Sequence, residues 1–291
     1  MRRARRVICF SCWCVVGALT LAGCNLFVPL AGTKTAKIER QPIPGAPCKY
    51  SERISQFVFL SDFKIRPDDA IVKDLGRLRE QVYRELRLPP ADTQVFVHIF
   101  ATQPEYQRFL DMRHPELPPR RAYFIAQPTR GGEDLVVYTY MNELTQRDLR
   151  HELTHAMLHC VLKRVPIWLD EGLAEYFEIP AGQNGVNAKH LEDLRQPDIR
   201  FNLQKLERLS EVQDMTPEKY REAWAWVHLM LRSTPRARQA LLDYLTELRI
   251  NPEPGALQPR LANAFLSIEN AMQSHLAELN RKLPRGATAR Q

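Results

Sequence analysis

The order of hydrophobic and polar residues predicts alternating strands and helices in the first part of the chain. Residues 57–60 form a short apolar run typical of a buried strand, and residues 93–100 form a second run of β-branched and aromatic residues. Between them, residues 67–88 carry apolar side chains at helical spacing, and the proline pair that begins at Pro89 ends this helix. A short helix is expected over residues 104–112. This order of elements indicates a small α/β layer.

A hairpin is predicted next. Two β-prone runs, residues 123–126 and 135–140, flank a loop that contains glycine. The second run leads directly into a predicted helix over about residues 145–162. One of the two strands can lie at a sheet edge beside a cleft, where an extended peptide would add as a further strand. An ordinary hairpin that faces solvent fits the pattern equally well.

The second half of the chain has a helical pattern, interrupted over residues 180–185 by proline and glycine. The predicted fold class is α+β: a small mixed sheet with helices over about residues 51–142, then a mainly helical part over about residues 143–283. The helix that begins near Thr145 stands between these two parts. Helices are expected at residues 167–178, within residues 187–212, and at residues 216–232, 236–248 and 259–283.

The N-terminus has the pattern of a targeting segment. A basic N-terminal segment is followed by an apolar run over residues 7–22, which is shorter than a typical transmembrane helix. The run ends in Leu21-Ala22-Gly23-Cys24, which resembles a bacterial lipobox. Residues 1–23 are therefore predicted to be a lipoprotein signal peptide, and Cys24 the lipidated first residue of an envelope protein held at the membrane by its anchor. An uncleaved anchor helix, or a signal peptide cut elsewhere, are the alternatives.

Both ends of the mature chain are expected to lie outside the fold. Residues 24–50 are rich in proline and glycine and read as a tether between the anchor and a domain of residues 51–283. Residues 284–291 are predicted to form a flexible tail. Only Cys48 and Cys160 follow Cys24. They either form a disulfide in an oxidising compartment or remain two separate thiols, and the sequence leaves both open.

Composition and charge exclude some classes of function. Of the 291 residues, 44% are hydrophobic and 26% are charged, as in ordinary globular proteins. The net charge of +7 falls to +3 without the four arginines of the predicted leader. The rest of the chain contains no dense basic block interleaved with aromatic residues, so nucleic-acid binding is not expected.

The chemistry of the chain is concentrated at His151-Glu152-Leu153-Thr154-His155, inside the predicted helix of residues 145–162. Residues four apart on a helix differ by about 40° around its axis, so both imidazoles can reach one Zn²⁺. Glu152 is rotated by roughly 100°, from where it can reach a water molecule beside the metal. A catalytic zinc site needs a third protein ligand, and Glu171 lies on the next predicted helix.

The segment from Trp168 to Tyr176 reads W-L-D-E-G-L-A-E-Y. Together with the first motif it resembles the gluzincin metallopeptidases, most closely the peptidase-MA-like domains of bacterial proteins of unknown function. The resemblance covers about residues 120–235. It implies a zincin-like fold and a zinc-dependent endopeptidase that acts on peptides or proteins in the cell envelope. The substrate-amine motif of aminopeptidases is missing, so exopeptidase specificity has no support.

The resemblance also implies roles for single residues. His151, His155 and Glu171 would bind one zinc ion, and Glu152 would act as the general base. Glu175, one turn beyond Glu171, would accept a hydrogen bond from the second ring nitrogen of His151.

Two residues are candidate donors to the oxyanion of a tetrahedral intermediate. Tyr220 resembles the tyrosine that begins a comparable helix in aminopeptidase-like gluzincins. His228 lies eight residues further on the same predicted helix, and packing in the core is its alternative role. His159 is not expected to bind the same ion, because three histidines at intervals of four span about 12 Å along a helix.

Two other functions remain open from the sequence. The first is a non-catalytic metal-binding or scaffold lipoprotein, which would need the metal ligands but not an intact Glu152. The second is a zinc hydrolase that cleaves a non-peptide amide, such as a linkage of the cell wall.

Overall fold

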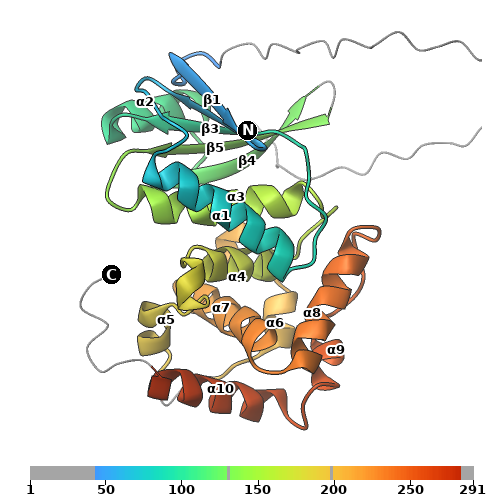
Figure 1. The fold of residues 1–291 in the computed structure, drawn as a ribbon. Helices are drawn as coiled ribbons and strands as arrows, with labels where there is room; N and C mark the ends of the chain where they lie inside the picture. The colour runs from blue at the N-terminus through green and yellow to red at the C-terminus, as the bar shows by residue number, and fades with distance from the viewer. Residues whose placement is uncertain (1–42, 130–131, 197–198, 283–291) are drawn as a thin grey trace, which may run out of the picture. The chain divides into compact units, whose positions relative to one another are not determined.

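Helix α3 (Thr145–His159), which carries the two motif histidines, lies between a β-sheet and a group of helices (Figure 1). The computed structural model describes residues 43–129, 132–196 and 199–282. No helix among these residues has the length and apolar character needed to cross a membrane. The predicted signal peptide, Cys24, residues 24–42 and the tail of residues 284–291 lie outside the described residues.

The described strands form one five-stranded sheet in the order β1-β2-β3-β5-β4. The two inner pairings, β2 with β3 and β3 with β5, are parallel, whereas β1–β2 and β4–β5 are antiparallel. The sheet is therefore mixed, and β4 is an edge strand. The strands are β1 (Tyr50–Ile54), β2 (Phe57–Ser61), β3 (Val95–Phe100), β4 (Ala122–Thr129) and β5 (Gly132–Tyr140).

Helices cover both faces of the sheet. Leu135 and Val137 of β5 pack with α1 (Ala70–Glu85) and α3, whereas Val136 and Tyr138 belong to a second cluster with α2 (Gln103–Arg113). Successive residues of a strand point to opposite faces, so a strand covered on both faces reads as a continuous apolar run. This explains why residues 135–140 are all buried.

The helical part is built around α4 (Ile167–Phe177) and α7 (Pro217–Arg232). Gly172 allows these helices to approach closely, because a Cβ atom there would lie 2.7 Å from the carbonyl oxygen of Ala223. The other helices are α5 (Ala188–Asp193), α6 (Leu203–Glu207), α8 (Pro235–Leu248), α9 (Gln258–Ala262) and α10 (Ile268–Lys282), with 3₁₀ turns η1 (Ala181–Gln183) and η2 (Val212–Asp214).

The predicted α+β class, with a mixed sheet followed by a mainly helical part, is confirmed. Several element ends differ by a few residues from the prediction, and two differences are larger. The region expected as helix over residues 259–283 contains two helices, α9 and α10. Residues 43–50, assigned to the tether, belong to the fold: Ala46 is buried, and β1 already begins at Tyr50.

Cys48 and Cys160 are separate free thiols, so the disulfide alternative is not realised. Cys48 precedes β1 at the end of the β1–β2 hairpin where Tyr50 pairs with Ser61. Cys160 lies at the other end, where its sulfur accepts a hydrogen bond from Gln56. A five-residue strand separates these ends by roughly 13–16 Å, far more than the Cα separation of a disulfide.

Candidate metal centre

The start of α3 is fixed to the end of β5 by hydrogen bonds. The hydroxyl of Thr145 donates to the carbonyl oxygen of Tyr140 at 3.0 Å and accepts from the backbone N–H of Asn142 at 2.7 Å. The side chain of Asn142 caps the same turn by accepting from the N–H of Leu144 at 2.7 Å. These contacts orient α3 so that one of its faces meets the sheet and the motif face meets α4.

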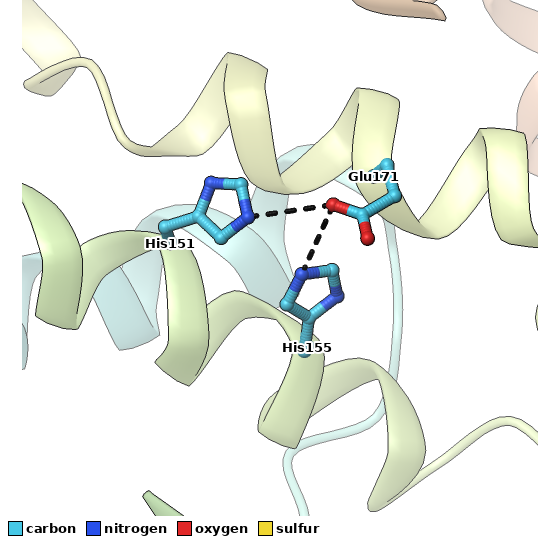
Figure 2. A group of neighbouring side chains, drawn as sticks. All are labelled: His151, His155 and Glu171. Atoms are coloured by element: carbon cyan, nitrogen blue, oxygen red, sulfur yellow. Dashed lines mark ion pairs between the residues drawn. The ribbon is translucent and has the colours of Figure 1, made fainter. Parts of the chain in front are cut away.

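His151 and His155 project from α3 toward Glu171 of α4 (Figure 2). The Oε2 atom of Glu171 lies 3.4 Å from Nε2 of His151 and 3.5 Å from Nε2 of His155. The three ligand atoms all lie within 4.8 Å of one another. Atoms bound at about 2.0–2.1 Å to one tetrahedral zinc ion are separated by about 3.3 Å. Two imidazoles and a carboxylate at these distances fit a zinc ion.

The charges of this cluster also suit a divalent cation. Burial disfavours a charged imidazole, but Asp170 and Glu171 outweigh it and raise the pKa of His155 to about 10. The pKa of His151 is likewise raised despite burial, because Glu171 and Glu178 accept hydrogen bonds from it. The pKa of Glu171 is lowered to about 2 by the two imidazoles, although burial opposes this. Without a metal, two bound protons balance the carboxylates, and a divalent cation would replace them.

Each histidine is held by a carboxylate at its other ring nitrogen. Nδ1 of His151 lies 3.1 Å from Oε2 of Glu178. Nδ1 of His155 lies 2.9 Å from Oδ1 of Asp170. This contact is an ion pair, because its geometry does not meet the criteria of a hydrogen bond. Such contacts set the orientation and basicity of a metal-binding imidazole. They leave Nε2 of both rings directed at Glu171.

The predicted role of Glu175 is taken by Glu178. Glu175 instead contacts Nε2 of His190 at 2.8 Å. Glu178 is the C-terminal cap residue of α4 and also accepts hydrogen bonds from Arg147 and from Asn187. Sequence reasoning missed Glu178, although it lies seven residues after Glu171 and therefore two helical turns along the same face. An oxygen of Glu175 still lies within 4.8 Å of His151, so the two acids share one side of that ring.

A buried arginine connects the two motif helices. Arg150 is 1% exposed, and its guanidinium pairs with Asp74 of α1 at 3.1 Å. The same guanidinium donates to the carbonyl oxygens of Phe177, Glu178 and Ile179 at the end of α4. Arg150 thereby positions the segment that carries Glu178 against α3.

Glu152 lies next to the three-ligand cluster and faces a cleft. Burial raises the pKa of its carboxyl group, while the neighbouring imidazolium charges and a hydrogen bond from the backbone of Phe124 act in the opposite direction. Phe124 belongs to edge strand β4, and its ring stacks on His155 at 6.3 Å between centroids. Of the two predicted hairpin strands, β4 is therefore the edge strand, and it lies beside the site and its cleft.

The cleft has a volume of about 790 Å³. It is lined by His151, Glu152 and Tyr220 of the candidate site, together with Tyr106, Tyr140 and Arg120. A cleft of this size can hold several residues of an extended peptide.

The two candidate oxyanion donors lie in different places. The hydroxyl of Tyr220 donates to Oε1 of Glu171 at 3.3 Å and lies in the cleft. His228 is 1% exposed and does not reach the site; its Nδ1 lies 2.8 Å from Nε2 of His275 beside a separate cavity. Eight residues advance a helix by about 12 Å and leave it about 80° out of phase, so His228 cannot share the position of Tyr220. The prediction for His228 is wrong.

His159 behaves as helix geometry predicts. Its Nε2 lies 3.1 Å from Oδ2 of Asp170, the acid that also pairs with His155. It is not in the group of side chains whose ligand atoms converge with Glu171.

Comparisons with known proteins add no assignment. No protein-family model matches the chain, and a search of curated proteins finds no significant match.

Proposed function

We propose that the protein is a zinc-dependent hydrolase, an endopeptidase of the gluzincin type, anchored in the bacterial cell envelope through lipid on Cys24. One observation carries the proposal: His151, His155 and Glu171 direct three ligand atoms within 4.8 Å of one another, and His151 lines a cleft together with the neighbouring Glu152. A structural zinc site is closed by four protein ligands, whereas three ligands at a cleft are typical of a catalytic site.

His151, His155 and Glu171 would hold the zinc ion. When bound, it would supply Lewis-acid polarisation of a carbonyl group and lower the pKa of a water molecule. Glu152 accepts the proton of the attacking water and delivers it to the leaving amine, a role that suits a carboxyl group whose pKa is raised by burial. Tyr220 donates a hydrogen bond to the oxyanion that develops on the substrate.

A peptide is the substrate class that the cleft fits best. Edge strand β4 lies beside Glu152 and has one unpaired side among the described strands. An extended peptide can pair with such an edge through its main chain, which aligns successive peptide bonds with the site. This supports an endopeptidase over an enzyme for small amides.

The proposal is tested with purified protein in three measurements. Metal analysis should find about one zinc per chain, and His151→Ala should abolish it. Digestion of a quenched fluorescent peptide library should occur and stop with a chelator. Glu152→Gln should keep its zinc and lose activity by a factor of at least about 100, the contribution expected of a general base.

Each failure has its own meaning. Full activity of Glu152→Gln would overturn the mechanism, and a chain that binds no zinc would overturn the site. Stoichiometric zinc without hydrolysis of any peptide would instead favour the non-catalytic metal-binding lipoprotein. Metabolic labelling with a fatty acid, compared between wild type and Cys24→Ala, tests the anchor.

A further inference from the structure

The cleft beside the candidate site contains one arginine whose charge has no carboxylate partner. Of the three arginines that line it, Arg121 forms two hydrogen bonds with Asp148 at 2.9 and 2.8 Å. Arg147 is paired with Glu178. Arg120 forms no ion pair within 4.0 Å with any acid of the described residues.

The contact that Arg120 does make points into the site. Its guanidinium interacts with the hydroxyl of Tyr220, which lines the same cleft, and that hydroxyl donates to Oε1 of Glu171 at 3.3 Å. A polar contact of about 3–4 Å between guanidinium and hydroxyl places the guanidinium roughly 6–7 Å from the oxygen of Glu171. A peptide extends about 3.3–3.6 Å per residue, so Arg120 reaches groups one or two residues from a bond held at the site.

The backbone of Arg120 is held in place. Its carbonyl oxygen accepts from the hydroxyl of Tyr106 at 3.1 Å, and the carbonyl oxygen of Arg121 accepts from Thr139 at 3.1 Å. Two prolines, Pro118 and Pro119, directly precede it and restrict the chain. The side chain therefore projects from a fixed point just before edge strand β4.

We propose that Arg120 is a specificity-determining residue that binds a carboxylate group of the substrate next to the bond that is cleaved. The guanidinium has five N–H donors, and the single hydroxyl of Tyr220 leaves a fork for bidentate binding of a carboxylate. The carboxylate belongs either to an acidic side chain or to the C-terminus of a peptide. This inference rests on the proposed function, because it assumes that peptides occupy the cleft.

The test uses two sets of matched peptides that wild type cleaves. In the first set a Glu/Gln pair is placed at each position within three residues of the cleaved bond, with an amidated C-terminus. In the second set no acidic side chain is present, and a free or amidated C-terminus falls one, two or three residues after the bond. The measured quantity is the ratio of kcat/KM between the charged and uncharged member of each pair.

Wild type should prefer the charged member at one position by about tenfold, as expected for charge-assisted hydrogen bonds in a partly solvated cleft. In Arg120→Gln this ratio should fall to about one, and in Arg120→Lys it should be intermediate because Lys lacks the planar fork. Arg121→Gln is the matched control: it lines the same cleft and should keep the wild-type ratio. A preference for the charged member in the first set shows that the bound group is an acidic side chain. A preference in the second set shows that it is the C-terminal carboxylate.

Three results would overturn the inference. A wild-type ratio near one at every position excludes a carboxylate preference. A ratio that survives in Arg120→Gln assigns the preference to another group. An equal loss of kcat for all peptides in Arg120→Gln, with the ratio unchanged, would show that Arg120 acts only by positioning Tyr220.

A binding measurement separates this inference from the proposed function. Fluorescence anisotropy of the same labelled peptides with zinc-loaded Glu152→Gln, with and without Arg120→Gln, reports carboxylate recognition without hydrolysis. If wild type cleaves no peptide, the proposed function fails. The ratio of the Kd values of the charged and uncharged peptides, with and without Arg120→Gln, then decides alone whether Arg120 binds a carboxylate. Thermal melting of each variant checks that it is folded.

Discussion

Replacement of Glu178 by glutamine tests how the candidate metal centre is organised. Oε2 of Glu178 lies 3.1 Å from Nδ1 of His151, and the side chain is only 7% exposed. Removing such a contact weakens metal binding by about 10–100-fold. Glutamine keeps an oxygen that can accept from Nδ1 but loses the negative charge, part of which Arg147 already balances. The expected effect of Glu178→Gln is therefore at the lower end of this 10–100-fold range. The Kd for zinc should rise about tenfold, which is a loss of about 1.4 kcal/mol of binding free energy.

The measurement is a competition between the protein and a chromophoric zinc chelator of known affinity near neutral pH. Glu175→Gln is the matched control, because Glu175 lies one turn earlier on α4 but hydrogen-bonds to His190. It should leave the Kd within about twofold of wild type, since its principal partner is not a ligand. Equal Kd values for Glu178→Gln and wild type would refute the assigned role of Glu178. A larger loss of zinc affinity in Glu175→Gln than in Glu178→Gln would assign that role to Glu175, as the sequence resemblance implies.

Three further predictions concern folding stability. Gly172→Ala should destabilise the protein by about 1–3 kcal/mol in urea unfolding, because its Cβ meets backbone of α7, whereas Gly182→Ala, with nothing within 4 Å of its Cβ, should have little effect. Arg150→Met should cost about 3–5 kcal/mol, since it leaves a buried carboxylate without its cation, and an unchanged urea midpoint would contradict this. Burial lowers the pKa of His228 to about 3 and that of His275 to about 4, so below about pH 6.5 these two side chains bind more protons in the unfolded chain than in the folded chain, and their contribution to stability falls as pH decreases. In zinc-free protein between about pH 6.5 and 4.5, His275→Gln should reduce this slope, and an unaltered slope would refute the assignment.

Most of the fold follows from the sequence pattern because its elements have strong periodicity. Strand β5 is one apolar run because it is covered on both faces, and α1 has a single apolar stripe that ends at Glu85, shortly before the proline pair. Strand β1 was not predicted: three of its five residues, in Tyr50-Ser51-Glu52-Arg53-Ile54, are exposed, and it is ordered by pairing with β2. Pairing of this kind depends on a partner rather than on local pattern, which also explains why residues 43–50 were assigned to a tether.

The part of the site that lies on a single helix could be predicted from helix periodicity alone. His151, Glu152 and His155 occupy positions set by one helix, and Glu171 converges on them, as the resemblance implies, although it lies on another helix. The residues beyond them depend on how three helices pack. His228 was a poor candidate for that reason, because its position on the same helix as Tyr220 did not reveal which neighbour it meets. Arg120 is likewise invisible in the sequence, since nothing local shows that it lacks a carboxylate partner.

Helix α4 shows why the second motif contains so many acids. The helix is buried along most of its length, and an unpaired carboxylate in such surroundings is strongly unfavourable. Each acid of α4 meets a histidine: Asp170 contacts His155 and His159, Glu171 contacts His151 and His155, and Glu175 contacts His190. Glu178, at the C-terminal cap, contacts His151. His151 and His155, at the centre of this ladder, balance the buried acids only while they are protonated or bound to a cation. Zinc bound at His151, His155 and Glu171 would satisfy the centre of the ladder, and we therefore predict that it protects the fold at alkaline pH.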